Sequence, residues 1–188
     1  MSIALTPETA ATRLRRGGLV AYPTEAVWGL GCDPFDADAV QRLLDLKRRP
    51  AAKGMIVIAA SLAQVVAHLC WDDLPETRRN AILASWPGPN TWLIPCRAHV
   101  PDWLRGEHDT LAVRITAHPI AAALCRAFDG PVVSTSANRA GEPPARTLQD
   151  IPSDLLAQLD GWLDGDTSGL MQPSTIRDAR NGQILRGG

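Results

Sequence analysis

The sequence has few lysines, no long hydrophobic run and almost no net charge, and each absence excludes a class of protein. Its 188 residues include 19 basic and 20 acidic side chains, which gives a net charge of −1. This balance argues against a generally cationic nucleic-acid binder, although it allows a local basic patch. No apolar run approaches the ~20 residues of a membrane span, and the N-terminus lacks the features of a signal peptide. We therefore expect a cytoplasmic protein that does not enter a membrane.

Motifs for metal binding and redox chemistry are also missing. The four cysteines and the four histidines are scattered, and neither set forms a zinc knuckle, a CxxC pair or an HExxH helix. We expect buried free thiols in a reducing compartment and no transition-metal site built by the protein. Hydrophobic residues make up 45% of the chain, which is enough for one core. We predict one domain over residues 1–188, without an additional C-terminal domain.

Lysine itself is almost absent, and its position is informative. Only two of the 19 basic residues are lysines, and these two, Lys47 and Lys53, lie close together. Arginine serves almost everywhere else in the chain. A retained lysine indicates a task that suits a compact, mobile point charge, such as binding a phosphate or a carboxylate.

Apolar runs and capping residues predict strands that alternate with helices. Pro and Gly residues bound most of these segments. This pattern is typical of an α/β fold, and we predict a twisted open sheet of parallel and antiparallel strands flanked by helices. We expect helices at about 6–17, 36–49, 61–69, 75–86, 118–128 and 153–159, and strands at about 19–22, 55–59, 91–94, 110–115, 131–134, 174–176 and 184–186.

A polar loop, residues 134–138, directly follows the predicted strand 131–134. Its sequence, STSAN, offers three hydroxyl groups and one amide without bulk. Ligands in open α/β sheets bind at the carboxyl ends of strands, and such groups suit phosphate or carboxylate oxygens. The loop can equally be a turn whose side chains satisfy their own backbone. The pattern alone leaves both interpretations open.

A cluster of four cations occupies residues 47–53, with the sequence KRRPAAK. Cations at the end of a helix complement its macrodipole and can simply face solvent. That accounts for Lys47 and Arg48, but Lys53 lies beyond Pro50 and just before a buried strand. The cluster therefore favours a phosphate site at the edge of the sheet.

Two further segments carry polar residues in or beside predicted strands. Thr24 and Glu25 follow a buried strand, either as a local turn or as ligand contacts, and Gly29-x-Gly31 beyond them lacks the rest of the dinucleotide-binding fingerprint. Arg114 lies within a predicted strand, where it needs an ion pair or a pocket. No nucleophilic triad and no carboxylate pair is recognisable. Cations and hydroxyls at strand ends fit phosphate-group chemistry, which depends on positioning and charge neutralisation.

Six motifs extend over nearly the whole chain. They are YPTEAVWGLG at 22–31, KRRPAAKG at 47–54, WPGPNTWLIP at 86–95, LAVRITAHP at 111–119, VVSTSAN at 132–138 and PSTIRD at 173–178. In this order they closely resemble the YrdC-like family of TsaC-type threonylcarbamoyl-AMP synthases. The resemblance implies a reaction in which ATP, L-threonine and bicarbonate (or CO2) give L-threonylcarbamoyladenylate and pyrophosphate. That adenylate serves N6-threonylcarbamoyladenosine formation at position 37 of tRNAs.

The resemblance also implies roles for individual residues. Lys47 and Arg49 would be catalytic, and Mg²⁺ would be carried mainly by the ATP phosphates, because no carboxylate cage is recognisable. The ATP contacts implied are Arg49, Lys53, Thr110, Ser136, Asn138 and Arg186, and the threonine contacts are Thr24, Arg114, Ser134 and Ser174.

The chain departs from the family pattern at several positions. Ala26 and Trp28 replace a common threonine and tyrosine, and Ile58 stands where longer relatives often carry a histidine that contacts threonine. The resemblance implies TsaB, TsaD and TsaE as functional partners. An alternative class is a module that binds double-stranded RNA or tRNA without forming an adenylate, with the arginines lining its surface.

Overall fold

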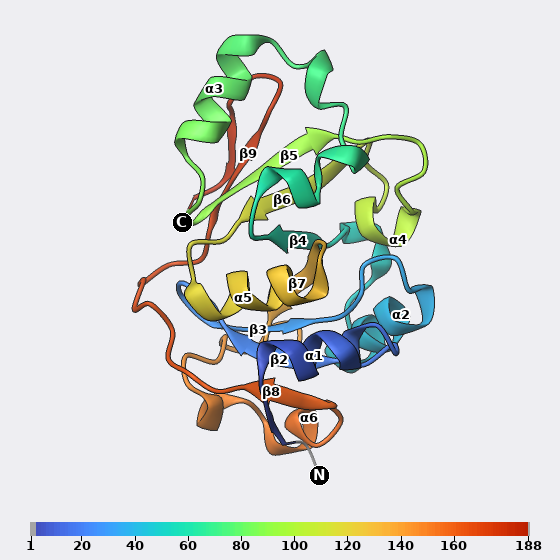
Figure 1. Ribbon diagram of the computed structural model, residues 1–188, viewed down its shortest axis with the longest axis vertical. Helices are drawn as coiled ribbons and strands as arrows, with labels where there is room; N and C mark the ends of the chain where they lie inside the picture. Colours follow the sequence, from blue (N-terminus) through green and yellow to red (C-terminus); the bar gives the residue numbers. More distant parts are fainter. Residues whose placement is uncertain (1–2, 188) are drawn as a thin grey trace.

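The computed structural model describes residues 3–187, which form an α/β structure around one mixed sheet (Figure 1). The strand order is β1-β8-β2-β3-β7-β4-β6-β5-β9-β10. The strands are β1 (Ala4–Leu5), β2 (Val20–Pro23), β3 (Trp28–Gly31), β4 (Ile56–Ala59), β5 (Asn90–Pro95), β6 (Thr110–Ile115), β7 (Val132–Ser136), β8 (Gly161–Leu163), β9 (Thr175–Asp178) and β10 (Ile184–Arg186).

The helices alternate with these strands along the chain. The α-helices are α1 (Pro7–Leu14), α2 (Ala37–Lys47), α3 (Glu76–Ala84), α4 (Asp102–Arg105), α5 (Pro119–Phe128) and α6 (Ser153–Leu156). Short 3-10 turns are η1 (Ala51–Lys53), η2 (Leu62–Gln64), η3 (Val66–His68), η4 (Trp71–Asp73) and η5 (Leu148–Asp150). Within the described residues, no helix is long and apolar enough to cross a membrane.

Parallel and antiparallel pairs are mixed within the sheet, as the sequence predicts. The central strand β7 runs antiparallel to both β3 and β4, whereas β4 and β6 are parallel. β5 is antiparallel to β6 and parallel to β9. The consecutive strands β2 and β3, and likewise β9 and β10, are joined without an α-helix and pair as antiparallel neighbours.

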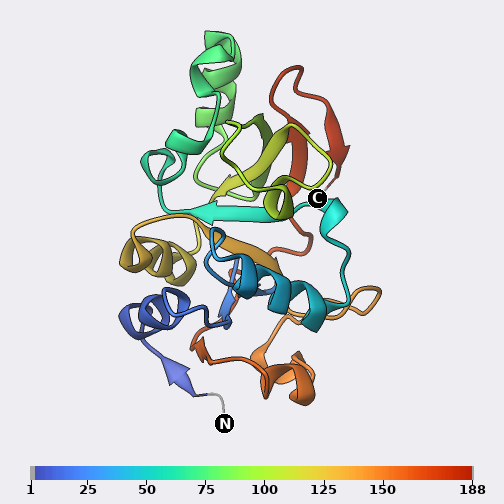
Figure 2. The ribbon, with the colours of Figure 1, turned by 90° about the vertical axis from the view of Figure 1, so that its right-hand side faces the viewer.

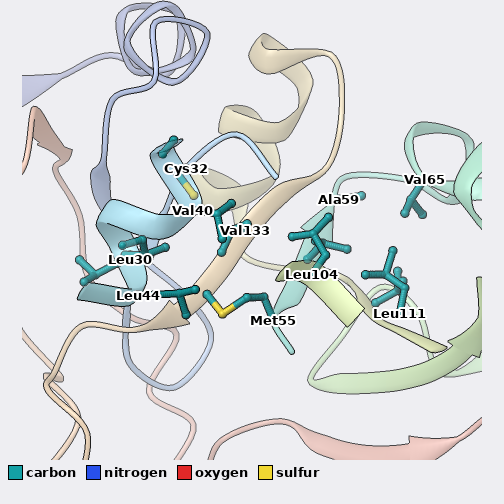
Figure 3. Packing of buried hydrophobic residues seen from close by; sticks show 14 of the residues in the cluster. Leu30, Cys32, Val40, Leu44, Met55, Ala59, Val65, Leu104, Leu111 and Val133 are labelled. Carbon is teal, nitrogen blue, oxygen red and sulfur yellow. The ribbon is translucent and has the colours of Figure 1, made fainter. Parts of the chain in front are cut away.

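Helices cover both faces of the sheet. α1 and α5 lie side by side in both views (Figures 1 and 2) and pack on one face, which includes Tyr22, Ile58 and Val132. On the opposite face, a larger apolar cluster runs from Val40 and Leu44 of α2 through Met55 to Leu104 and Leu111 (Figure 3). Successive strand residues point to opposite faces, so both clusters draw on the same strands.

Several sequence predictions of elements are wrong. Strand β3 lies between the predicted strand at 19–22 and the predicted helix at 36–49, where the sequence predicts no element, and the sequence likewise predicts neither β1 nor β8. The predicted helix at 61–69 is instead the two turns η2 and η3, where the β-branched pair Val65–Val66 disfavours a helix. Leu69 then pairs with Cys96 in an isolated β-bridge. The helix predicted at 153–159 is shorter in the structure, where α6 ends at Leu156.

The glycines of β3 accommodate the buried ring of Tyr22 in β2. A Cβ atom on Gly31 would lie 2.5 Å from the Val133 carbonyl oxygen and 2.8 Å from the Tyr22 ring, and one on Gly29 would lie 3.3 Å from that ring. Tyr22 also donates a hydrogen bond of 2.9 Å from its hydroxyl group to the Val133 carbonyl. Gly29-x-Gly31 therefore serves strand packing.

The four cysteines are free thiols. Cys32 and Cys125 are buried as predicted, whereas Cys70 and Cys96 are partly exposed, so the prediction of burial is wrong for these two. Among the described residues, no three His, Cys, Asp or Glu side chains are grouped so that they could hold a metal ion.

Candidate functional site

A cavity of about 520 Å³ is lined by residues of β3, β4, β5, β6, β7, β9 and β10 and of the segments beside them. Strand alternation explains its polar wall. Ser134 and Ser136 follow Val132 on one face of β7, and Thr110, Ala112 and Arg114 share one face of β6. Ten of the eleven residues predicted from the resemblance line this cavity: Arg49, Lys53, Thr110, Ser136, Asn138, Arg186, Thr24, Arg114, Ser134 and Ser174.

The eleventh predicted residue, Lys47, lies behind the wall. It is the last residue of α2 and is only 3% exposed. Its ammonium donates hydrogen bonds to the backbone carbonyls of Ser136 and Asn138. Burial and the nearby Arg49 cation lower the pKa of Lys47 to about 8. The interpretation of Lys47 as a helix-end cation that faces solvent is therefore wrong, because the side chain is buried.

The polar loop at 134–138 combines both interpretations of its sequence. The Asn138 amide donates to the carbonyls of Arg139, at 2.8 Å, and Glu142, at 2.6 Å, and so satisfies its own turn. The Asn138 Oδ1 atom, however, is buried without a hydrogen-bond partner. The same side chain therefore stabilises the loop and leaves one acceptor free at the cavity wall.

The cations that follow α2 reach the cavity through an irregular segment. Arg48 ends the helix in the left-handed conformation (φ +51°), and Pro50 precedes the turn η1, which carries Lys53. The Arg49 guanidinium donates a 3.0 Å hydrogen bond to the Gly54 carbonyl, while its Nε is buried without a partner. Burial lowers the pKa of Arg49.

Hydroxyl groups and Arg114 line the cavity wall formed by β3, β6 and the segment before β9. Thr24 donates from Oγ1 to the Val27 carbonyl at 2.6 Å and so fixes the turn between β2 and β3. Thr91 donates to Ser174 Oγ at 2.9 Å. The Arg186 guanidinium donates to the Ser174 carbonyl at 3.0 Å. These bonds fix Thr24 and Ser174 at the cavity wall.

Arg114 is paired from outside the cavity. Its Nη1 lies 3.4 Å from Oε2 of Glu25, and the two side chains are only 9% and 5% exposed. Glu25 itself does not line the cavity. Of the two possibilities that the sequence left for Arg114, an ion pair or a pocket, the structure shows both at once.

The charge around the cavity is strongly positive. Arg49, Lys53, Arg114 and Arg186 all line it, and no acidic side chain of the described chain does so. Burial and the cations of Arg114 and Arg49 lower the pKa of Arg186. Cations are brought this close only where an anion can offset their mutual repulsion, so the cavity suits a polyanionic ligand.

Sequence reasoning missed part of the lining. Arg105 and His108, around the end of α4, also line the cavity, and no motif around them indicates a ligand. The apolar part of the lining includes Leu93, Leu104 and Ile176. The sequence does signal the lining residues of β6, because Thr110 and Arg114 are two polar residues on one face of a strand that is otherwise apolar.

Ile58, where relatives often carry histidine, does not line the cavity. It is fully buried in the apolar cluster beneath α1 and α5, whereas Ile56 on the same face of β4 does line the cavity. No ligand contact from Ile58 is therefore available in this chain.

The chain belongs to the Sua5/YciO/YrdC family, whose model, described as "Telomere recombination", matches residues 12–188. It is 56% identical over 182 residues to a threonylcarbamoyl-AMP synthase of Stenotrophomonas maltophilia, which covers 97% of this chain and 98% of that relative. The family resemblance read from the six motifs is thereby confirmed.

Solved structures share the fold. The chain superposes on P. abyssi Sua5 complexed with L-threonine with a TM-score of 0.86 and 32% identity over 95% of this chain. It spans only 54% and 60% of the two P. abyssi Sua5 chains that it matches. The fold of E. coli YciO is also similar, with a TM-score of 0.82 over 99% of this chain. The predicted mixed α/β fold is confirmed.

Proposed function

We propose that this protein is a threonylcarbamoyl-AMP synthase, which converts ATP, L-threonine and bicarbonate into L-threonylcarbamoyladenylate, pyrophosphate and water. The observation that carries the proposal is a cavity lined by five cationic side chains and a set of hydroxyl groups, without an acidic side chain among the described lining residues. The curated relatives named for this activity match the chain over nearly their whole length, and they support the enzyme over an RNA-binding module.

The reaction needs charge neutralisation more than acid–base groups. A carbamate oxygen of N-carboxy-threonine attacks the α-phosphorus of ATP, a new P–O bond forms, and the bond to the bridging oxygen breaks as pyrophosphate leaves. Arg49, Lys53 and Arg186 would offset the negative charge of the triphosphate. Thr110, Ser136 and Asn138 would supply the neutral contacts around it.

The amino-acid substrate would occupy the part of the cavity around Arg114. A guanidinium binds a carboxylate through two parallel hydrogen bonds. Arg114 lies on β6, and only β4 separates this strand from β7, which carries Ser134; Thr24 precedes β3, the neighbour of β7 on its other side. Thr24, Ser134 and Ser174 would bind the remaining polar groups of L-threonine. The P. abyssi Sua5 structure complexed with L-threonine supports an L-threonine site in a protein of this fold.

The described site fits Mg²⁺ only as a companion of ATP. Its side-chain oxygens are neutral, and the one buried acceptor without a partner is Asn138 Oδ1. Mg²⁺ prefers oxygen ligands and keeps several waters. Asn138 and Ser136 would be its protein-side neighbours, and the ion would supply neutralisation of the departing pyrophosphate.

Lys47 would act through the loop rather than on the substrate. Its two hydrogen bonds hold the backbone of Ser136 and Asn138, while Lys47 itself does not line the cavity. Its charge adds to the positive field without contact. We therefore propose that Arg49 is the catalytic cation of the pair and that Lys47 is a positioning residue.

The product of this reaction must be used by a second reaction, because an acyl adenylate is unstable in water. The resemblance implies that this second reaction is tRNA modification in the cytoplasm, with TsaB, TsaD and TsaE as functional partners. Direct contact with tRNA or double-stranded RNA would be secondary to adenylate formation.

The test is pyrophosphate release from ATP by the purified protein, with L-threonine or bicarbonate omitted in turn. We expect release only with both present. Arg49→Ala should lose at least about 100-fold in rate, whereas Arg13→Ala, an exposed residue of α1, should match the unaltered protein. RNA binding that falls steeply with salt, with no pyrophosphate release, would instead support the binding module.

A further inference from the structure

Glu25 is a buried carboxylate that the predicted set of substrate contacts leaves out. It follows Thr24 in the segment between β2 and β3 and is 3% exposed. Burying a carboxylate costs free energy unless charges and hydrogen bonds compensate for it. The contacts of Glu25 therefore indicate what the residue is for.

One carboxylate oxygen of Glu25 is fully used within the protein. Oε1 accepts a 2.8 Å hydrogen bond from the Thr116 hydroxyl and a 2.9 Å hydrogen bond from the Ala117 backbone N–H. Both donors lie directly after β6, the strand that carries Arg114. The carboxylate is thus anchored to the end of that strand.

The other oxygen faces Arg114. Oε2 accepts no hydrogen bond and lies 3.4 Å from Arg114 Nη1, and Arg114 Nε also lacks a partner. Burial raises the pKa of Glu25, but the Arg114 cation and the hydrogen bonds to the carboxylate outweigh it and lower the pKa below its usual value. The pair is therefore ionic, and Arg114 retains donors for a second anion.

The position of Arg114 needs an anchor of this kind. Arg49 and Arg186 line the same cavity, and like charges repel Arg114 from that side. A carboxylate on the outer side attracts the guanidinium away from these cations and fixes its orientation. The Glu25 carbonyl also accepts a 3.0 Å hydrogen bond from the Leu170 N–H, so the segment that leads to Ser174 is tied to the same residue.

We infer that Glu25 is a positioning residue that orients the Arg114 guanidinium toward the carboxylate of the amino-acid substrate. The inference rests on the proposed function. It implies that Glu25 affects binding of L-threonine and leaves binding of ATP unchanged, because its contacts are with Arg114 and the β6–α5 turn rather than with Arg49 or Lys53.

Glu25→Gln tests this with little change in shape. The glutamine oxygen can still accept from Thr116 and Ala117, but an uncharged amide replaces the oxygen that faces Arg114. We expect the KM for L-threonine to rise about tenfold, as for a lost hydrogen-bonded charge, with the KM for ATP within about twofold. The matched control is Glu76→Gln, at an exposed glutamate of α3, which should change neither constant.

A double variant separates positioning from a general structural effect. If Glu25 acts through Arg114, Glu25→Gln should add nothing to the KM for L-threonine in an Arg114→Met background. Additive effects, or an equal rise in both KM values, would overturn the inference. Circular dichroism checks the fold of each variant.

Glu25→Asp decides the question if the glutamine variant does not fold. Aspartate keeps the charge but is too short to hold both Thr116 and Arg114, so a rise in the KM for L-threonine alone is again expected. An unchanged KM for L-threonine would overturn the inference. If the unaltered protein itself shows no threonine-dependent pyrophosphate release, the proposed function fails first, and the two failures are thereby distinguished.

Discussion

The Lys47 ammonium donates a hydrogen bond to the backbone carbonyl of Asn138, a residue that lines the cavity, although Lys47 itself does not line it. The scarcity of lysine in the chain thus coincides with a place where a compact ammonium fits and a guanidinium does not. The buried end of α2 supports the loop of β7 that meets the triphosphate in the proposed mechanism.

Lys47→Arg should impair turnover although it keeps the positive charge. A planar guanidinium is larger than an ammonium and has no room between two carbonyls at a position that is 3% exposed. We expect the kcat for pyrophosphate release to fall at least about tenfold, by displacement of the catalytic loop. Arg48→Lys, the reverse exchange at the exposed neighbour, serves as the control, and normal turnover in Lys47→Arg would contradict the positioning role.

The ionisation of Lys47 should appear in the pH dependence of stability. Its pKa is about 8 in the folded chain, against an ordinary 10.5. Between these values the unfolded chain holds the proton that the folded chain has lost, so rising pH favours the folded chain. Relative to Lys47→Met, the free energy of unfolding should therefore rise from about pH 8 to pH 10.5, by a total on the order of 3 kcal/mol.

Chemical denaturation of both proteins at several pH values measures this difference. Below about pH 7, where the lysine is protonated in both states, the difference should stay constant. A difference that stays constant through pH 10 as well would show that the Lys47 pKa is not lowered by folding.

Gly31→Ala should destabilise the fold without involving the cavity directly. The added Cβ would lie 2.5 Å from the Val133 carbonyl oxygen and 2.8 Å from the Tyr22 ring, both in the interior of the sheet. Overpacking of this kind costs about 1–3 kcal/mol. Gly130→Ala is the matched control, because its nearest neighbour to the new Cβ is a Phe128 ring atom at 3.7 Å. Equal thermal stability of the two variants would contradict this account of β3.

Arg186→Ala should weaken ATP binding. Arg186 lines the cavity and is oriented by the Ser174 carbonyl, while Arg180, near the other end of the same hairpin, pairs with exposed Asp109. Loss of a cation from a phosphate site removes a charge-assisted contact, so the KM for ATP should rise at least about tenfold. Arg180→Ala should leave it within about twofold, because exposed ion pairs contribute little. A similar effect of both substitutions would argue against a specific phosphate contact.

The sequence predicted the main helices and strands because their signals are local. Thr6 and Asp36 cap α1 and α2 as their types suggest, and the strand predicted at 110–115 coincides with β6. β3 escaped prediction because Gly29 and Gly31 have low strand propensity, and only the distant Tyr22 ring explains them. Short β1 and β8 form by pairing with each other and with β2 rather than by their own pattern.

The site was predictable in membership but not in arrangement. Ten residues implied by the resemblance line the cavity, whereas the absence of Lys47 from the lining depends on how α2 packs against β7. The contact between Glu25 and Arg114 likewise depends on the position of β2 relative to β6, which no local pattern contains.

The most direct test of the central claim is transfer of labelled carbon from bicarbonate into an adenylate. With ATP, L-threonine and carbon-14 bicarbonate, we expect a labelled nucleotide of the mass of threonylcarbamoyl-AMP, formed in equal amount to pyrophosphate in a short incubation. No labelled adenylate above the threonine-free blank, from a folded protein supplied with Mg²⁺, would contradict the proposed function.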